Sequence, residues 1–167
     1  MGNFDELLQA SVSIPSAHGR FQIGEKSDEF EDIQHLRPAF SFEYACLDKS
    51  EFSFRYNAIS ARDFQKLIEG LRGASKATYQ SMSTNYRFHF HEVKWDEVSV
   101  AESDFYKCIQ NPYKGDRDLT VYQFKVFEEA RVIGFIYRSI FYLVMFDRNH
   151  NAYDRDRPQR RGKRKRG

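Results

Sequence analysis

The chain has only two cysteines and four prolines among its 167 residues, and it has no long apolar stretch. Cys46 and Cys108 are distant in sequence and lack the close spacing typical of metal ligands, so we expect two free thiols in a reducing cytosol. The longest apolar stretch, residues 140–146, is far shorter than the roughly 20 residues that a membrane-spanning helix needs. Residues 1–14 include acidic side chains and no apolar core segment, so we expect no secretory signal peptide. These absences predict a cytoplasmic protein without a membrane partner.

Aromatic residues, by contrast, are abundant. The chain holds 16 Phe and 10 Tyr, and such side chains favour strands and bury a large area each. A chain of this length supports one domain with a proper core. We therefore expect a single α+β domain over residues 38–154, preceded by a flexible N-terminal arm over residues 1–37 and followed by a disordered basic tail over residues 155–167.

Local patterns predict the elements of that domain. Alternation of aromatic and polar residues predicts strands over 40–44, 52–56, 86–91 and 120–127, the first two of them forming a hairpin. Two apolar strands, 131–138 and 140–147, form a second hairpin. Helices are predicted to begin near Ser60, Ser75 and Ser99, and a short one lies over about residues 3–10. The expected fold is a mostly antiparallel sheet with two or three helices packed on one face.

The positive charge of the chain is concentrated in its tail. The net charge of the whole chain is +2, yet residues 155–167 contain eight Lys or Arg against the single Asp156, so the rest of the chain is net acidic. Such a tail neutralises several phosphates and gives salt-sensitive, sequence-indifferent affinity for nucleic acid. A solubilising terminus and an acidic protein partner are the alternatives. The candidate nucleic-acid-binding residues are Arg155, Arg157, Arg160, Arg161, Lys163, Arg164, Lys165 and Arg166.

Three histidines are candidates for chemistry. On a strand, His89 and His91 would point to the same face, where they fit a metal site, an acid–base pair, an RNA contact or simply the polar face of an aromatic strand. His150 follows the last predicted strand, two residues after Arg148 and shortly before Tyr153. Phosphodiester cleavage needs a general acid or base, cations that neutralise charge on phosphorus, and an aromatic surface on which a base stacks. A turn in which His150 satisfies backbone groups is the structural alternative.

The stretch from Phe141 to Asp154, which ends in Asn-His-Asn-Ala-Tyr-Asp, resembles the end of RelE/HigB-type toxin domains. In those domains a final hydrophobic strand runs into a Thr-His-Ala-Glu-Tyr-Asp-like sequence, and the predicted order of strand, helix pair and antiparallel strands is similar to that superfamily's fold. The resemblance implies a metal-independent mRNA endoribonuclease that needs no cofactor, acts on the ribosome and pairs with an antitoxin protein. It implies catalytic roles for His150 and Tyr153 and, by looser analogy, for Arg131, an inner-strand arginine that holds the scissile phosphate.

A second, broader likeness covers roughly residues 40–153. The Phe-Ser-Phe-x-Tyr sequence at 40–44 and the Arg-Val-x-Gly-Phe sequence at 131–135 are similar to a group of uncharacterised bacterial proteins. The leading hypothesis is a RelE-like protein that binds RNA or the ribosome and cleaves mRNA. His150 would be the acid or base, Arg131 and Arg148 would stabilise phosphate charge, and Tyr153 would orient or stack. The alternative hypothesis is a non-catalytic nucleic-acid- or protein-binding accessory module of a phage or defence system.

Overall fold

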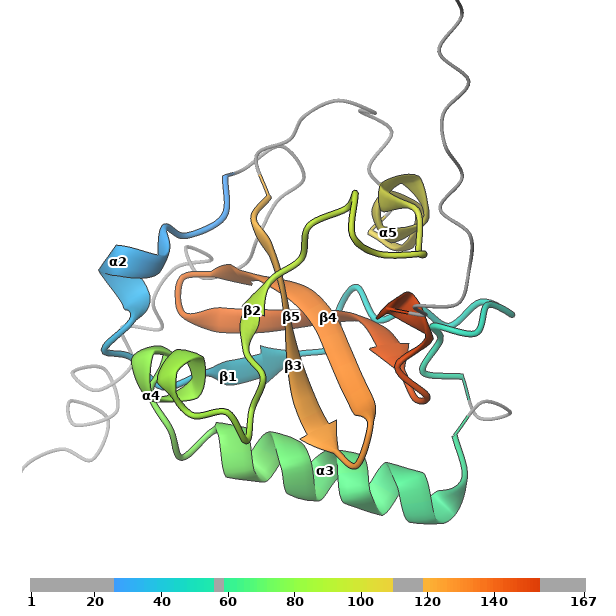
Figure 1. Cartoon of the computed structure of the whole chain (residues 1–167), viewed down its shortest axis with the longest axis horizontal. Helices are drawn as coiled ribbons and strands as arrows, with labels where there is room; N and C mark the ends of the chain where they lie inside the picture. Colours follow the sequence, from blue (N-terminus) through green and yellow to red (C-terminus); the bar gives the residue numbers. More distant parts are fainter. Residues whose placement is uncertain (1–25, 56–58, 110–118, 154–167) are drawn as a thin grey trace, which may run out of the picture.

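The computed structural model describes residues 26–55, 59–109 and 119–153 (Figure 1). Helices and strands alternate in the first part of the chain, and three consecutive strands close it. In chain order the elements are α2 (Phe30–Ile33), β1 (Ala39–Ser41), α3 (Ala61–Ala74), α4 (Tyr79–Thr84), β2 (His91–Glu92), α5 (Glu102–Cys108), β3 (Val121–Phe127), β4 (Ala130–Tyr137), β5 (Ile140–Asp147) and a 3-10 turn (Asn151–Tyr153).

One five-stranded sheet organises the molecule, with the strand order β1-β5-β4-β3-β2. The pairs β2–β3, β3–β4 and β4–β5 are antiparallel, whereas β1 pairs in parallel with β5. The strands predicted over residues 120–127, 131–138 and 140–147 are confirmed as β3, β4 and β5, because each is long, apolar and bounded by a tight turn. The expected α+β class with a mostly antiparallel sheet is confirmed as well.

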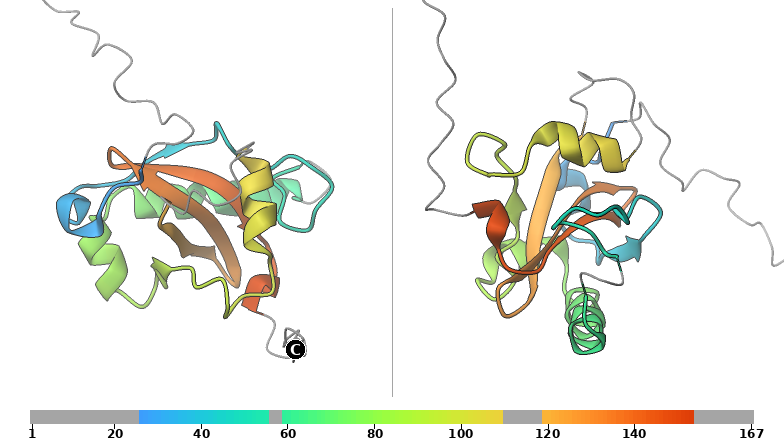
Figure 2. Two further views of the ribbon diagram at one scale, coloured as in Figure 1. Left: turned by 90° about the horizontal axis from the view of Figure 1, so that it is seen from above. Right: turned by 90° about the vertical axis from the view of Figure 1, so that its right-hand side faces the viewer.

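Helices cover both faces of this sheet. On one face α3 buries Leu67, Leu71 and Ala74 against a core that also holds Phe124 from β3. On the other face α5 buries Phe105 in a second core. The right-hand view of Figure 2 shows α3 and α5 on opposite sides of the strands. The expectation that all helices pack on one face is therefore wrong, and the reason is that β4 and β5 are apolar on both faces and need cover on each.

The hairpin predicted for residues 40–44 and 52–56 does not form. Ala39–Ser41 pairs instead with β5, and the described part of the second segment, up to residue 55, runs beside the sheet without a strand ladder. The Phe54 N–H donates to the Cys46 carbonyl and the Phe146 N–H to the Phe52 carbonyl, at 2.8 and 3.0 Å. Phe52 packs in the core under α5 and Phe54 against the core under α3. The alternating aromatic residues of this second segment are therefore buried in two different cores. An irregular extended segment shows the same alternation as a hairpin strand, so the pattern does not distinguish the two.

The strand predicted over residues 86–91 is also wrong for most of its length. Only His91 and Glu92 pair with β3. The Asn85 side chain accepts from the Arg87 N–H at 3.0 Å, and its carbonyl accepts from the Phe88 N–H at 3.0 Å, so this segment begins as a turn. His89 then adopts a left-handed backbone conformation with φ of 44°. His89 and His91 are consequently not two positions of one regular strand.

Of the three helix starts predicted from serine residues, one is confirmed and two are wrong. The Ser60 hydroxyl accepts from the backbone N–H of Asp63, as predicted for the start of α3. Ser75 instead ends α3, and Thr78 is the residue whose hydroxyl caps α4. Ser99 donates its hydroxyl to a backbone carbonyl of the 3-10 turn, at 2.7 Å, and α5 begins three residues later. A serine's capping role depends on which backbone groups lie within its reach, which local sequence does not fix.

Residues 26–37, the described part of the expected N-terminal arm, contact the sheet. The Asp28 N–H donates to the Ile136 carbonyl at 2.9 Å, and its carboxylate accepts from the Ser139 N–H at 2.8 Å. Ile33 of α2 is buried in the core beside α3. The helix expected over residues 3–10 and the basic tail lie outside the described residues. Across the described ranges, no helix has the length and apolar character needed to cross a membrane.

Two glycines of α3 make a matched test of how closely this helix approaches β3. A Cβ added at Gly70 would lie 2.3 Å from the Val126 carbonyl oxygen, whereas one at Gly73 would have no atom within 4 Å. We expect Gly70→Ala to lower the free energy of unfolding by about 1–3 kcal/mol, because helix and strand must separate. Gly73→Ala should raise it by about 0.5–1 kcal/mol through helix propensity. Urea denaturation of both variants measures the difference, and equal midpoints would contradict the described α3–β3 packing.

Candidate functional site

The buried carboxylate of Asp147, at the end of β5, accepts hydrogen bonds from the backbone of the turn that follows the strand. Asp147 is 2% exposed, and its two oxygens accept from the backbone N–H groups of Asn151 and Ala152, at 2.8 and 2.9 Å. Burial raises the pKa of Asp147, although the two backbone hydrogen bonds oppose that shift. His150, with φ of 59°, directly precedes the 3-10 turn of residues 151–153. The carboxylate therefore holds His150 and Tyr153 against the end of the sheet.

Tyr153 lies between two histidines that are distant in sequence. Its ring centroid is 5.4 Å from that of His150 and 6.0 Å from that of His91, the latter edge-on. The Gln123 side chain lies 2.6 Å from His91 Nε2, and His91 Nδ1 lies 2.9 Å from the Glu92 carbonyl oxygen. These two contacts fit a His91 that donates through Nδ1 and accepts through Nε2. The last turn of the chain thus contacts the β2–β3 edge of the sheet.

Arg131 lies in the neighbouring strand, β4, where its backbone is opposite Asp147. The arginine is 4% exposed, and one guanidinium nitrogen donates to the carbonyls of Glu129 and Ala130 at 2.9 and 3.4 Å. A second nitrogen lies 3.8 Å from the Glu129 carboxylate, and the same carboxylate is 3.9 Å from His150 Nδ1. The Glu129 carboxylate therefore lies between the Arg131 guanidinium and the His150 ring.

Burial and positive charge keep two of the histidines neutral. Burial is the first cause that lowers the pKa of His150, and the Arg131 charge lowers it further. The pKa of His89 is lowered in the same way, first by burial and then by Arg131 and Lys125. Burial raises the pKa of Tyr153 to about 12. At neutral pH the site therefore presents imidazoles that are able to accept a proton beside a permanent cation.

His89, His91, His150, Tyr153 and Arg131 together form what we call the histidine edge. Sequence analysis placed His150, Tyr153 and Arg131 in one site, and the structure brings them together. It adds His89 and His91, which the sequence presented only as a separate pair. Within the described ranges, neither of these two histidines belongs to a group of three or more side chains that could hold a metal ion.

Arg148 turns to a different part of the molecule. Its guanidinium is 3.0 Å from the Asp63 carboxylate and 3.4 Å from that of Glu128, and it lies over the Phe127 ring at 4.9 Å. The hydrogen bond from Arg148 is the main cause that lowers the pKa of Asp63. Arg148 therefore fastens the start of α3 to the β3–β4 turn, and the structure does not group it with His150 as the sequence reasoning did.

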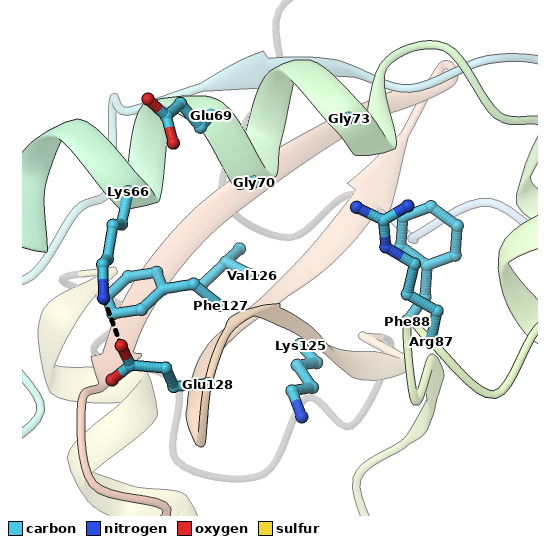
Figure 3. Close-up of a pocket in the computed structure, with 10 residues that line it drawn as sticks. All are labelled: Lys66, Glu69, Gly70, Gly73, Arg87, Phe88, Lys125, Val126, Phe127 and Glu128. Atoms are coloured by element: carbon cyan, nitrogen blue, oxygen red, sulfur yellow. Dashed lines mark hydrogen bonds and ion pairs between the residues drawn. The ribbon is translucent and has the colours of Figure 1, made fainter.

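A cavity of about 420 Å³ opens between α3 and β3, next to the histidine edge (Figure 3). Lys66 extends from α3 across the Phe127 ring to Glu128, with which it forms an ion pair. The lining residues are Lys66, Glu69, Gly70, Gly73, Arg87, Phe88, Lys125, Val126, Phe127 and Glu128. Three cations and two aromatic rings thus surround an open space, which we call the α3–β3 groove.

The groove and the histidine edge adjoin at residues 88–89 and Lys125, but the groove lies on the α3 side of the sheet, whereas Tyr153 packs against the core under α5. Arg87 and Phe88 directly precede His89, and Lys125 is among the charges that lower the pKa of His89. Tyr86, which is 87% exposed, comes just before them. Sequence reasoning missed this surface because it assigned residues 86–91 to a regular strand. The interleaved cations and aromatic residues of that stretch were the available signal.

The fold and the site define an α+β protein with a histidine-lined sheet edge beside a basic and aromatic groove. The chain belongs to the family described as Uncharacterised protein UU032, whose model matches residues 45–165. The matched range includes every residue of the histidine edge. No curated protein and no solved structure matched the chain.

The two depressed histidine pKa values give a pH prediction. We expect His150 and His89 to titrate below 6.5 in the folded protein, and Glu129→Gln to lower both values further, because the Glu129 carboxylate stabilises the imidazolium forms. Unfolded histidines bind protons at higher pH than these, so the free energy of unfolding should fall as pH drops from 6.5 through the folded-state values. NMR titration of the histidine rings measures the shifts. A rise in either pKa in Glu129→Gln would contradict the assigned electrostatics.

Proposed function

We propose that this protein binds single-stranded RNA along the α3–β3 groove and the histidine edge. The observation that supports the proposal best is that residues 86–91, 123–131 and 150–153 bring cations, imidazoles and aromatic rings to two adjoining parts of the protein, the groove and the histidine edge. Proteins recognise unpaired RNA by stacking its bases on aromatic and guanidinium planes while cations contact the phosphates. Tyr86 and Arg87 offer such planes, and Lys125, whose backbone N–H donates to the Phe88 carbonyl at 2.6 Å, would contact a phosphate.

The distribution of charge supports the same assignment. Outside the tail the chain is net acidic, so a polyanion is repelled from most of its surface and attracted where cations are local. Lys125 and Arg87 line the groove without a salt bridge among the described residues, whereas Lys66 is already paired with Glu128. The basic tail would add sequence-indifferent affinity for the phosphates that flank the groove.

The resemblance to RelE/HigB toxins supports this proposal and extends it. As in the order that the resemblance implies, β1, α3 and α4 come before the antiparallel strands β3–β5, although β2 and α5 lie between them in the chain. A RelE-like protein would meet its RNA on the ribosome and would be held inactive by an antitoxin protein. In that arrangement the tail contacts ribosomal RNA while the groove receives the mRNA.

RNA binding is tested by three single substitutions in the groove and its rim. Tyr86→Ala, Arg87→Ala and Lys125→Ala should each weaken binding of a fluorescent single-stranded RNA by about 1–3 kcal/mol, which is roughly 5- to 150-fold. Lys76→Ala is the matched control, because Lys76 is an exposed cation that does not line the groove. Removal of residues 155–167 should also reduce the dependence of affinity on salt. Equal affinity of the groove variants and the control would refute the proposed surface.

A second function, cleavage of the bound RNA without a metal, is favoured by the neutral His150 next to Glu129 and Arg131. His150 would remove the proton from a ribose 2′-hydroxyl, whose oxygen attacks phosphorus and displaces the 5′-oxygen. The products are a 2′,3′-cyclic phosphate and a 5′-hydroxyl, and the leaving oxygen takes up one proton. Arg131 would offset charge on phosphorus, and Tyr153 would hold the His150 ring.

Cleavage predicts a toxic phenotype that depends on His150. Induced wild-type protein should arrest growth and shorten bulk mRNA, and His150→Ala should lower the cleavage rate by about 100-fold or more. Variant Lys76→Ala, expressed to the same level, should behave as wild type. RNA binding with intact mRNA in the wild type would instead identify the non-catalytic accessory module, and persistence of arrest in His150→Ala would exclude His150 as the base.

A further inference from the structure

Two cysteines that are distant in sequence meet on the face of the sheet opposite the groove. Cys46 lies in the segment between β1 and α3, and Cys108 is the last residue of α5. Their sulfur atoms and a carboxylate oxygen of Asp48 all lie within 4.8 Å of one another. Both views of Figure 2 show the segment around residues 44–55 beside α5. The three side chains therefore converge from two separate parts of the fold.

Backbone hydrogen bonds fix the positions of these side chains. The Cys46 N–H donates to the Val144 carbonyl of β5 at 2.8 Å, and the Cys46 carbonyl accepts from the Ser53 hydroxyl at 3.1 Å. Asp48 Oδ1 accepts from the Ser50 N–H at 2.8 Å. Cys108 is held by α5, whose Phe105 is fully buried in the core. The backbone that carries Cys46 and Asp48 is thus held in place before any ligand arrives, which lowers the cost of binding one.

The cluster opens onto a small cavity of about 220 Å³. Cys46 is buried, Cys108 is partly buried and Asp48 is exposed, so the sulfur atoms lie below a carboxylate at the surface. The cavity is lined by Asp48, Ser50, Phe52, Asp104, Lys107, Cys108 and Met145. Asp104 and Lys107 form an ion pair of 2.6 Å at its rim. A small ion with its water ligand has room to enter from this side.

Two thiols and one carboxylate this close together offer three of the four ligands that a zinc ion takes. Zinc takes four ligands in a tetrahedron, with thiolates at about 2.3 Å and carboxylate oxygens at about 2.0–2.2 Å. Ligand atoms around such an ion are closer together than 4.8 Å, so a small inward movement of the exposed Asp48 and of Cys108 completes the geometry. Soft thiolate ligands also favour zinc over magnesium and calcium, which prefer oxygen.

We propose that Cys46, Asp48 and Cys108 bind one zinc ion, with a water molecule as the fourth ligand. Binding would release the thiol protons, and the two thiolates and one carboxylate would leave a single net negative charge around the ion. Lys107, at the rim, offsets that charge. The ion would join the segment after β1 to the end of α5. The α3–β3 groove lies on the opposite face of the sheet, so this site is separate from the groove.

The experiment measures zinc in the full-length protein purified under reducing conditions. We expect about one zinc per chain by elemental analysis, a rise in melting temperature on adding zinc, and sulfur-to-cobalt charge-transfer absorption after cobalt replacement. Cys108→Ser and Asp48→Asn should each weaken zinc affinity at least tenfold, measured by competition with a chromogenic chelator. Asp96→Asn is the control, because Asp96 is exposed and lies outside the cavity lining.

Three outcomes would overturn the proposal. One is a reduced, folded wild-type protein that takes up no zinc. Another is a Cys46–Cys108 disulfide that forms in place of metal binding under the same conditions. The last is zinc whose affinity is unchanged in Cys108→Ser and Asp48→Asn but is lost in a His89→Ala, His91→Ala double variant. Circular dichroism of each variant separates loss of the ion from loss of the fold.

Discussion

The burial of β4 and β5 on both faces is the constraint on which the rest of the structure depends. All eight residues of β4, and all but the first of β5, are shielded from solvent. A strand pair of this kind cannot face water, so one layer must cover each side. The layer of α3 and α4 fills one side, and α5 with the segment after β1 fills the other. At the groove and at the cysteine cluster, the covering layer leaves a cavity beside the sheet.

Sequence patterns predicted an element correctly where the element is long and the strand or capping residue that it pairs with is close in sequence. The β3–β5 strands and α3 were predicted because their periodicity runs over seven residues or more and their turns or caps are local. The same reasoning gave wrong strand predictions for the segments around residues 40–44, 52–56 and 86–91. Each alternates aromatic and polar residues, but its main partner is distant in the chain: β1 pairs with β5, and Phe52 accepts a hydrogen bond from the Phe146 backbone. The alternation of aromatic and polar residues indicates which side chains are buried, but it does not indicate which strand a segment pairs with.

The residues of the candidate site also fall into two groups, those that local sequence predicts and those that only tertiary packing brings together. His150 and Tyr153 were predicted because they follow a recognisable strand and match the RelE/HigB resemblance, and Arg131 by looser analogy to that family; the pairing of Arg131 opposite Asp147 is what brings them together. Arg148 also lies next to His150 in sequence, yet Asp63 and Glu128 bind it on another side of the sheet. The meeting of Cys46 with Cys108, and of His91 with Tyr153, depends on tertiary packing alone. No spacing rule within one sequence would have revealed either pair.

The parallel pairing of β1 with β5 has a consequence for how the chain folds. The β4–β5 hairpin brings together residues that are close in sequence, so little loop entropy is lost when it forms. Pairing of Ala39 with Ile140, by contrast, closes a loop that contains α3, α4, α5 and three strands. Such contacts are made late, because the intervening chain must first become compact. Until β1 docks, the outer edge of β5 is free to accept a strand from another molecule, and the short β1 is what blocks that edge in the finished protein.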